Sequence, residues 1–225
     1  GQGPQVIVED VQAALELLGV AARVRCGAHR TAVTGSAGKT SVKEMLAQIY
    51  RAFGPAHWNV KSFNNHWGVP LTLARMPEET LRAVFEIGMS TPGEIAPRSQ
   101  MVRPHTGIVT CIAGAHLEGY ETDGNESRIQ LDIVGKPVLV TINAVGEHWA
   151  MNAAAAVLAA SQSGLAIEEC AAALSGYTPP PGRGTAEQLR LPQGGHITLI
   201  DDAYNANPAS MKASQTPIIE IPRIM

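Results

Sequence analysis

The segment from Val33 to Ser41, V-T-G-S-A-G-K-T-S, has the residue types of a phosphate-binding loop. Gly35 and Gly38 would let backbone N–H groups approach an anion closely, and a helix that begins after them would direct its positive dipole end at the same point. Lys39 could then reach terminal phosphates, while the Thr40 hydroxyl could bind Mg²⁺. The usual G-x-x-x-x-G-K-[ST] spacing puts its first glycine at position 33, which is valine here. The alternative to a phosphate-binding loop is a glycine turn followed by a serine that caps the helix.

Several apolar segments end on a side chain that could bind a cation or a sugar. Glu86 closes L-R-A-V-F-E, His116 comes after T-G-I-V-T-C-I, and Asp201 and Asp202 come after H-I-T-L-I. If these segments are parallel strands, their carboxyl ends meet at the ligand-binding edge of an open α/β sheet. Glu86 and His116 could then share a magnesium site with Thr40, and the aspartates could accept hydrogen bonds from ribose. A solvent-facing strand end, a structural histidine and a turn-rich loop are the respective alternatives.

Three further residues could contact a nucleotide. His148 and Asn152 stand four residues apart where a helix is expected to begin, so they share a face and could touch one ligand. Arg183 lies between two glycines in P-P-P-G-R-G and could clamp a phosphate. Helix capping and ordinary packing explain His148 and Asn152 equally well, and the alternative for Arg183 is an exposed loop cation.

The elements that would position these residues alternate between helices and strands. Apolar residues at helical spacing predict a short helix at 10–18, for which Gly19 is a plausible stop. T-A-V-T reads as a buried strand, and helical spacing returns directly after the glycine loop, at 42–53. The loop is therefore expected to join a strand to a helix.

The second half of the chain adds a hairpin and two helices. Apolar and polar residues alternate on both sides of Gly135-Lys136-Pro137, as in a β-hairpin, and alanine-rich helices are expected at about 149–162 and 167–174. Together with the recurring strands, this pattern predicts an α/β fold. We expect a mostly parallel, P-loop-containing sheet flanked by helices, with a small β-hairpin extension.

Composition limits the classes of function. The 225 residues are 45% hydrophobic, as expected for a globular protein, and their net charge of −3 argues against a nucleic-acid partner, which usually requires a basic face. Three cysteines without a C-x-x-C pair imply neither a disulfide framework nor a zinc site. This cysteine usage favours the reducing cytoplasm. The uncharged run at 149–167 is broken by polar residues, so we expect no membrane insertion.

Six motifs in order resemble those of the Mur ligase family: T-G-S-A-G-K-T-S, F-N-N-H-W-G-V-P, E-I-G-M-S-T-P-G-E-I, A-H-L-E-G-Y, G-E-H-W-A-M-N and D-D-A-Y-N-A-N-P-A-S-M-K. The family's own loop, T-G-S-x-G-K-T, also lacks the first glycine. The resemblance covers about residues 10–213. It implies the ATP-binding central domain of such a ligase at residues 29–213, after a linker and helix at 1–28 and before an unassigned tail at 214–225.

The resemblance also implies a role for each candidate residue. The ATP phosphates would lie on the loop formed by Thr34, Gly35, Ser36, Ala37, Gly38, Lys39, Thr40 and Ser41. Magnesium would be held by Thr40, Glu86 and His116, and the catalytic set would be Lys39, Glu86, His116 and Arg183. The remaining implied contacts are those of His148 and Asn152 with the adenine side, Arg183 with the phosphates, Asp201 or Asp202 with the ribose, and Asn64 and Asn65 with the muramoyl substrate.

The activity implied by the resemblance is ATP-dependent ligation of a carboxylate to an amine in peptidoglycan precursor synthesis. The motifs are most similar to those of members that join D-alanyl-D-alanine to UDP-N-acetylmuramoyl tripeptide through an acyl phosphate, and we expect a monomer. A sibling ligase that adds another amino acid, a generic P-loop kinase and a nucleotide-binding module without turnover are the alternatives.

The sequence departs from the family pattern in its length and in one internal segment. Family members are longer, with an amino-terminal domain that binds the UDP end and a carboxy-terminal domain that closes over ATP, and neither has a match here. Between A-H-L-E-G-Y and the hairpin, the family also has a lysine that becomes carbamylated and binds a second magnesium ion. A segment is therefore expected to be missing near 120–127.

Overall fold

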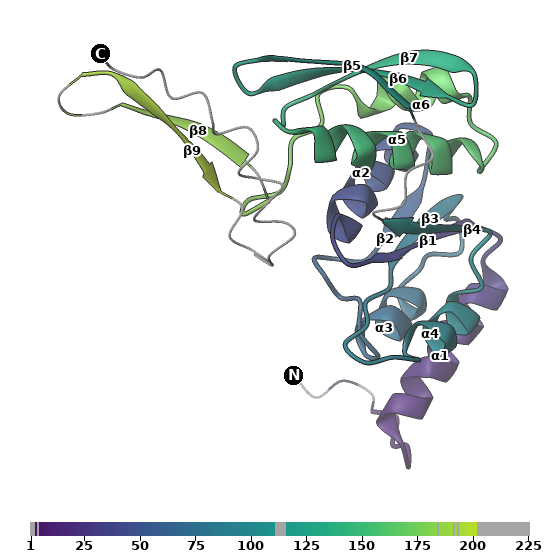
Figure 1. Cartoon of the computed structure of the whole chain (residues 1–225). Helices are drawn as coiled ribbons and strands as arrows, with labels where there is room; N and C mark the ends of the chain where they lie inside the picture. Colours follow the sequence, from purple (N-terminus) through teal and green to yellow (C-terminus); the bar gives the residue numbers. More distant parts are fainter. Residues whose placement is uncertain are drawn as a thin grey trace.

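The computed structural model describes residues 3, 5–110, 116–183, 185–190, 192 and 194–201. Within these ranges, the elements follow in the order α1 (Val11–Arg25), β1 (His29–Gly35), α2 (Lys39–Ala52), β2 (Ala56–Trp58), α3 (Gly68–Ala74), β3 (Arg82–Glu86), α4 (Ile95–Val102), β4 (Thr106–Thr110), β5 (His116–Asp123), β6 (Glu126–Ile133), β7 (Lys136–Ile142), α5 (Glu147–Ser161), α6 (Ile167–Leu174), β8 (Thr185–Arg190) and β9 (His196–Asp201). Figure 1 shows these elements stacked in layers, with the β8–β9 hairpin projecting to one side.

A parallel sheet in the order β2-β3-β1-β4 carries the candidate residues. Residues 31–33 of β1 are buried because helices cover both faces of the sheet. The register pairs Val33 with Glu86 on one side, and Gly35 with Thr110 on the other. The carboxyl ends of β3 and β4 therefore lie on either side of the point where β1 enters the glycine loop.

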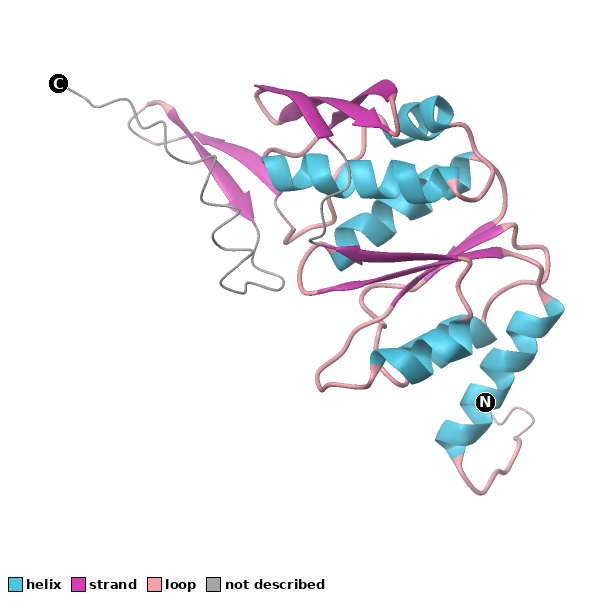
Figure 2. Ribbon diagram, turned by 45° about the vertical axis from the view of Figure 1, so that its right-hand side comes forward, coloured by secondary structure: helices cyan, strands magenta, loops and turns pink. Residues whose placement is uncertain are grey.

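Two separate cores form on the two faces of this sheet. Helices α1, α3 and α4 lie on one face, and α2 and α5 lie on the other, beneath the antiparallel sheet (Figure 2). Side chains of β3 alternate between the cores, since Phe85 belongs to the first and Val84 to the second. No helix within the described residues has the length and apolar character required to cross a membrane.

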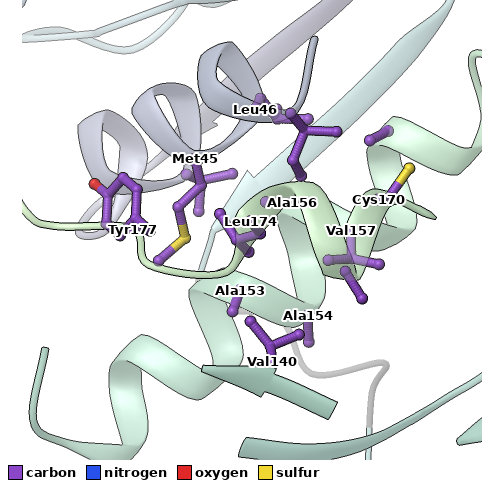
Figure 3. Close-up of a cluster of buried hydrophobic side chains, with 14 of the residues drawn as sticks. Met45, Leu46, Val140, Ala153, Ala154, Ala156, Val157, Cys170, Leu174 and Tyr177 are labelled. Carbon is purple, nitrogen blue, oxygen red and sulfur yellow. The ribbon is translucent and has the colours of Figure 1, made fainter. Parts of the chain in front are cut away.

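Small residues in α5 let the second core pack closely. Figure 3 shows Met45 and Leu46 of α2 near Ala153, Ala156 and Val157 of α5, and all of these residues are buried. The predicted helices at 149–162 and 167–174 correspond to α5 and α6, with differences only at the ends of α5. The alanine-rich run is therefore a buried helix of this core, as expected from its composition.

The expected hairpin is part of a three-stranded antiparallel sheet in the order β5-β6-β7. Val134 and Gly135 form its turn with φ of 56° and 76°, and the Gly135 N–H donates to Asp132 Oδ1 over 2.7 Å. The segment near 120–127 forms a second turn, in which Asp123 pairs with Glu126. Strand β5 was not predicted. The expectation that this chain lacks a family segment near 120–127 stays a prediction.

Two sequence expectations about the elements are wrong. Gly19 does not end the first helix, because α1 continues to Arg25 and Gly19 is buried against α3. A Cβ at Gly19 would lie 3.0 Å from the Pro70 carbonyl oxygen and 3.2 Å from Leu73 Cβ, so this glycine allows two helices to approach. H-I-T-L-I is β9, which pairs antiparallel with β8 in a separate two-stranded sheet and is not a strand of the parallel sheet.

Candidate functional site

The glycine loop joins β1 to α2 as expected. Gly38 is the N-cap residue of α2, with φ of 81° and ψ of −12°, and no side chain donates or accepts a capping hydrogen bond there. The alternative of a helix-capping serine is therefore wrong. Because the first N–H groups of a helix have no partner within the helix, this end of α2 presents donors and a positive dipole end to an anion.

Two close contacts explain why the loop needs glycine. Gly35 has φ of 127°, and a Cβ there would lie 2.2 Å from Thr110 Oγ1. The single proton of the Thr110 hydroxyl is shared between the Thr34 carbonyl, 3.1 Å from Oγ1, and the Ala37 carbonyl, so this side chain contacts both sides of the loop. A Cβ at Gly38 would lie 2.7 Å from an Asn152 side-chain oxygen. The loop is thus held in shape by β4 and touched by α5.

Lys39 folds over the loop that precedes it. Its Nζ donates to the Gly35 carbonyl over 2.7 Å and to the Ser36 carbonyl over 3.3 Å. Neither acceptor carries a formal charge, and among the described residues no carboxylate forms an ion pair with Lys39. The loop therefore holds a half-buried cation whose charge could be matched by a phosphate.

Glu86 lies directly against the first turn of α2. Its side chain is buried, with 1% exposure, so the alternative of a solvent-facing strand end is wrong. The Thr40 hydroxyl donates to Glu86 Oε2 over 2.8 Å, and Asn64 Nδ2 donates to Oε1 over 2.6 Å. The site thus combines a hydroxyl and a carboxylate, the oxygen ligands that Mg²⁺ prefers, beside the phosphate-binding loop.

The structure does not test His116 as a metal ligand. Its backbone begins β5 and pairs with Asp132 in the antiparallel sheet, while its side chain lies outside the described part of the chain. Within the described residues, no group of three His, Cys, Asp or Glu side chains could hold a metal ion. The Thr40–Glu86 pair is therefore the part of the expected magnesium site that the structure brings together.

The two asparagines expected near the muramoyl substrate have partners within the chain. Asn64 orients Glu86, as described above, and its backbone carbonyl accepts from the Gly88 N–H over 2.9 Å. Asn65 Oδ1 accepts from the N–H groups of Trp67 and Gly68 at the start of α3, over 3.1 and 2.8 Å. Both residues thus stabilise the loop between β2 and α3, and their contact with substrate stays a prediction.

Helix α5 carries two candidates, His148 and Asn152, which stand one helical turn apart. Asn152 touches the glycine loop at Gly38, whereas the His148 ring packs beside Gly146 and lies 5.5 Å from the Trp149 ring between centroids. Arg183 Nη2 donates to Ser62 Oγ over 3.3 Å, which places it at the loop after β2. The expected contacts of these side chains with adenine and phosphate stay predictions.

Asp201 does not share the sheet edge with Glu86. It is the last residue of β9 and is exposed, and it pairs with Thr185 in the two-stranded sheet. The expectation that it follows a parallel strand is wrong, because β9 has an antiparallel partner. Asp202 lies outside the described residues, so a ribose contact by either aspartate stays a prediction.

Comparison with known proteins agrees with this geometry. Residues 33–125 match the family model of the Mur ligase middle domain. The UDP-N-acetylmuramoyl-tripeptide–D-alanyl-D-alanine ligase of Bacillus subtilis (strain 168) is 30% identical over 263 residues, which cover 93% of this chain and 57% of that protein. The protein of the same name from Escherichia coli (strain K12) is 29% identical over 280 residues, with coverage of 97% and 61%.

The chain is also similar to solved structures of Mur ligases. The crystal structure of MurF from Acinetobacter baumannii superposes with a TM-score of 0.83 at 26% identity, and covers 93% of this chain and 58% of that one. These matches support a MurF-like Mur ligase, and the fold of the chain is that of the central domain of this family. It spans about three fifths of the length of these relatives.

Proposed function

We propose that this chain is the nucleotide-binding domain of an ATP-dependent ligase that joins D-alanyl-D-alanine to UDP-N-acetylmuramoyl tripeptide. The observation that carries the proposal is the position of the buried Glu86 carboxylate, which contacts Thr40 in the first turn of the helix that follows the glycine loop. This arrangement supports binding of a phosphate chain with its cation. The names of the relatives support the choice of substrates.

The glycine loop and Lys39 would bind the ATP phosphates. The N–H groups at the start of α2 have no side-chain cap, so they can donate to phosphate oxygens. Lys39 would exchange its two carbonyl acceptors for a phosphate oxygen, and a charge-assisted hydrogen bond is stronger than a bond to a neutral carbonyl. Thr110 would keep the loop in the required conformation through its bonds to the carbonyls at 34 and 37.

Thr40 and Glu86 would hold the magnesium ion that accompanies ATP. Both side chains offer oxygen atoms, and the carboxylate supplies negative charge at a buried position where a cation would offset its desolvation. When bound, magnesium neutralises charge on the phosphates. Asn64 would keep one carboxylate oxygen oriented by its hydrogen bond, so that the other faces Thr40.

Asn152, His148 and Arg183 would bind other parts of the nucleotide. Asn152 contacts the loop at Gly38, which supports a position beside the bound nucleotide. Arg183 reaches the loop after β2 through Ser62, and a guanidinium near this loop could help to neutralise the transferring phosphoryl group. His116 would complete the magnesium site, and Asp201 or Asp202 the ribose contact.

The ligation itself requires positioning rather than a nucleophilic side chain. ATP would phosphorylate the tripeptide carboxylate, and the amine of D-alanyl-D-alanine would then displace the phosphate. The residues of this domain would contribute by holding the phosphates in line and by stabilising charge that develops on them. Asn64 and Asn65 lie in the loop between β2 and α3, and the contact of Asn64 with Glu86 supports an acceptor position on this side of the nucleotide.

Two measurements test the proposal. In calorimetric titrations with Mg·ATP, Lys39→Ala should weaken binding by about 10- to 150-fold, since a hydrogen bond to a charged group contributes about 1.5–3 kcal/mol. Lys136→Ala, which removes an exposed lysine from β7, is the matched control and should bind as tightly as the wild type. Equal affinity of the Lys39→Ala variant would remove this residue from the site.

The substrate is tested by phosphate release from the polypeptide that carries this domain. With UDP-N-acetylmuramoyl tripeptide and Mg·ATP present, release should depend on D-alanyl-D-alanine and not on single L-amino acids. A preference for one L-amino acid would identify a sibling ligase instead, and nucleotide binding without any turnover would favour a binding module.

A further inference from the structure

Lys43 is a buried lysine that no part of the proposed function uses. It lies on α2, one turn after Lys39, and its side chain is fully buried. Its Nζ donates to the carbonyls of Asn59 and Lys61 over 3.0 and 2.6 Å, and it forms an ion pair with Glu44 Oε1 over 2.6 Å. All three N–H bonds of the ammonium therefore have acceptors. Because burying a charge is costly, this arrangement requires an explanation.

The loop that Lys43 holds is the one that orients Glu86. Asn59, which is also fully buried, accepts from the Glu86 N–H through Oδ1 over 2.5 Å and donates to the Phe63 carbonyl over 2.6 Å. Asn64 then donates to the Glu86 carboxylate over 2.6 Å. Residues 59–64 thus contact both the backbone and the side chain of Glu86.

Helix α2 therefore controls Glu86 by two routes. Thr40 contacts the carboxylate directly, and Lys43, three residues later and thus on the same face of α2, contacts the loop that holds Glu86. The loop also includes Lys61 in a left-handed conformation, with φ of 53°, which is costly for a residue with a Cβ. The hydrogen bond from Lys43 to the Lys61 carbonyl stabilises this conformation.

We propose that Lys43 is a positioning residue for the cation site. By fixing residues 59–64 against α2, its ammonium sets the orientation of the Glu86 carboxylate relative to Thr40, although Lys43 contacts neither side chain. The inference rests on the proposed function, because it assumes that Thr40 and Glu86 hold the magnesium that accompanies ATP. It predicts that the magnesium dependence of ATP binding depends on Lys43.

The test is a set of calorimetric ATP titrations across magnesium concentrations and in excess EDTA. Lys43→Met should weaken magnesium-dependent binding by about 10- to 100-fold, as observed when residues that orient metal ligands are lost, and should change ATP affinity in EDTA much less. Tyr50→Phe is the control on the same helix, since it removes a buried hydrogen bond to Thr31. It should lower stability and leave the magnesium dependence unchanged.

A double variant separates positioning from a general loss of structure. If Lys43 acts through Asn64, then Lys43→Met should have little further effect on magnesium dependence in an Asn64→Ala background. Should Lys43→Met fail to fold, Lys43→Arg takes its place: it keeps the buried charge, but its larger planar head group cannot occupy the same position without moving the loop. It should fold and still show weaker magnesium dependence.

The outcomes distinguish this inference from the proposed function. If the wild type binds Mg·ATP, and the Lys43 variants lose only stability, as Tyr50→Phe does, the inference is wrong and the proposed function stands. If the wild type shows no magnesium-dependent ATP binding, both are wrong. Additive effects of Lys43→Met and Asn64→Ala would contradict the route through Asn64.

Discussion

Replacing Glu86 with glutamine would separate the charge of this side chain from its shape. The side chain is 1% exposed and accepts hydrogen bonds from Thr40 and Asn64, over 2.8 and 2.6 Å. The glutamine carbonyl oxygen can still accept from Asn64, and the Thr40 hydroxyl can turn to accept from the new amide. Glu86→Gln therefore keeps both contacts and removes the negative charge.

Glu86→Gln is expected to be neutral or favourable for stability without magnesium, and unfavourable for ATP binding with magnesium. Within the described residues, no cation forms an ion pair with Glu86, so a buried carboxylate lacks charge compensation when magnesium is absent. Glu86→Gln should then leave the free energy of unfolding unchanged or raise it. With magnesium, the variant should lose about 1.5–3 kcal/mol of binding, a decrease of about 10- to 150-fold in magnesium-dependent ATP affinity.

Both effects can be measured on one preparation. Urea unfolding in EDTA would give the stability, and calorimetric ATP titrations across magnesium concentrations would give the binding. A variant that unfolds more easily in EDTA, and binds ATP with the magnesium dependence of the wild type, would refute the reasoning. Glu86 would then be a structural side chain of the strand end.

Three other predictions concern the loop and the histidines. Gly35→Ala should destabilise the fold by about 1–3 kcal/mol or more in urea unfolding, since the new Cβ would collide with Thr110. Gly164→Ala is the control: Gly164 also has a positive φ, but a Cβ there would have no neighbouring atom, so this variant measures the cost of the backbone conformation alone. Thr110→Val should cost about 1 kcal/mol of stability and weaken ATP binding in calorimetry. The free energy of unfolding should fall as pH decreases through 6.5, because burial lowers the pKa of His29 and His57 from that value.

The pH prediction depends on which state binds more protons. Because the folded-state pKa of His57 lies below 6.5, the unfolded chain binds more protons between the two pKa values. The stability is therefore fully present above pH 6.5 and is lost as the pH falls towards the lower folded-state pKa. His57→Gln should flatten the pH dependence of the unfolding free energy between pH 7.5 and 5.5, and an unchanged slope would show that the residue does not contribute.

The parts of the site that follow from local sequence were predictable. The glycine loop needs only a strand, two glycines and a helix in order, so its place between β1 and α2 followed from spacing. The proximity of Glu86 to Thr40 followed from a general property of parallel sheets, in which strand ends gather at one edge. Neither step required knowledge of a distant contact.

The parts that depend on distant partners were missed. Gly19 has the local features of a helix stop, but packing against α3 keeps it inside α1. The apolar pattern of β9 indicates a strand without indicating its partner, so its antiparallel pairing with β8 was not predicted. Thr110 and Lys43 have no motif of their own, because their roles arise from contacts with loops that lie far from them in the sequence.

The most direct test is a crystal structure of this chain with Mg²⁺ and a non-hydrolysable ATP analogue. We expect the phosphates to lie on the N–H groups of residues 35–41, with Lys39 turned from the Gly35 carbonyl to a phosphate oxygen. Magnesium should lie beside the Thr40 hydroxyl and the Glu86 carboxylate. A nucleotide bound elsewhere, or a magnesium ion in contact with neither side chain, would contradict the proposed site.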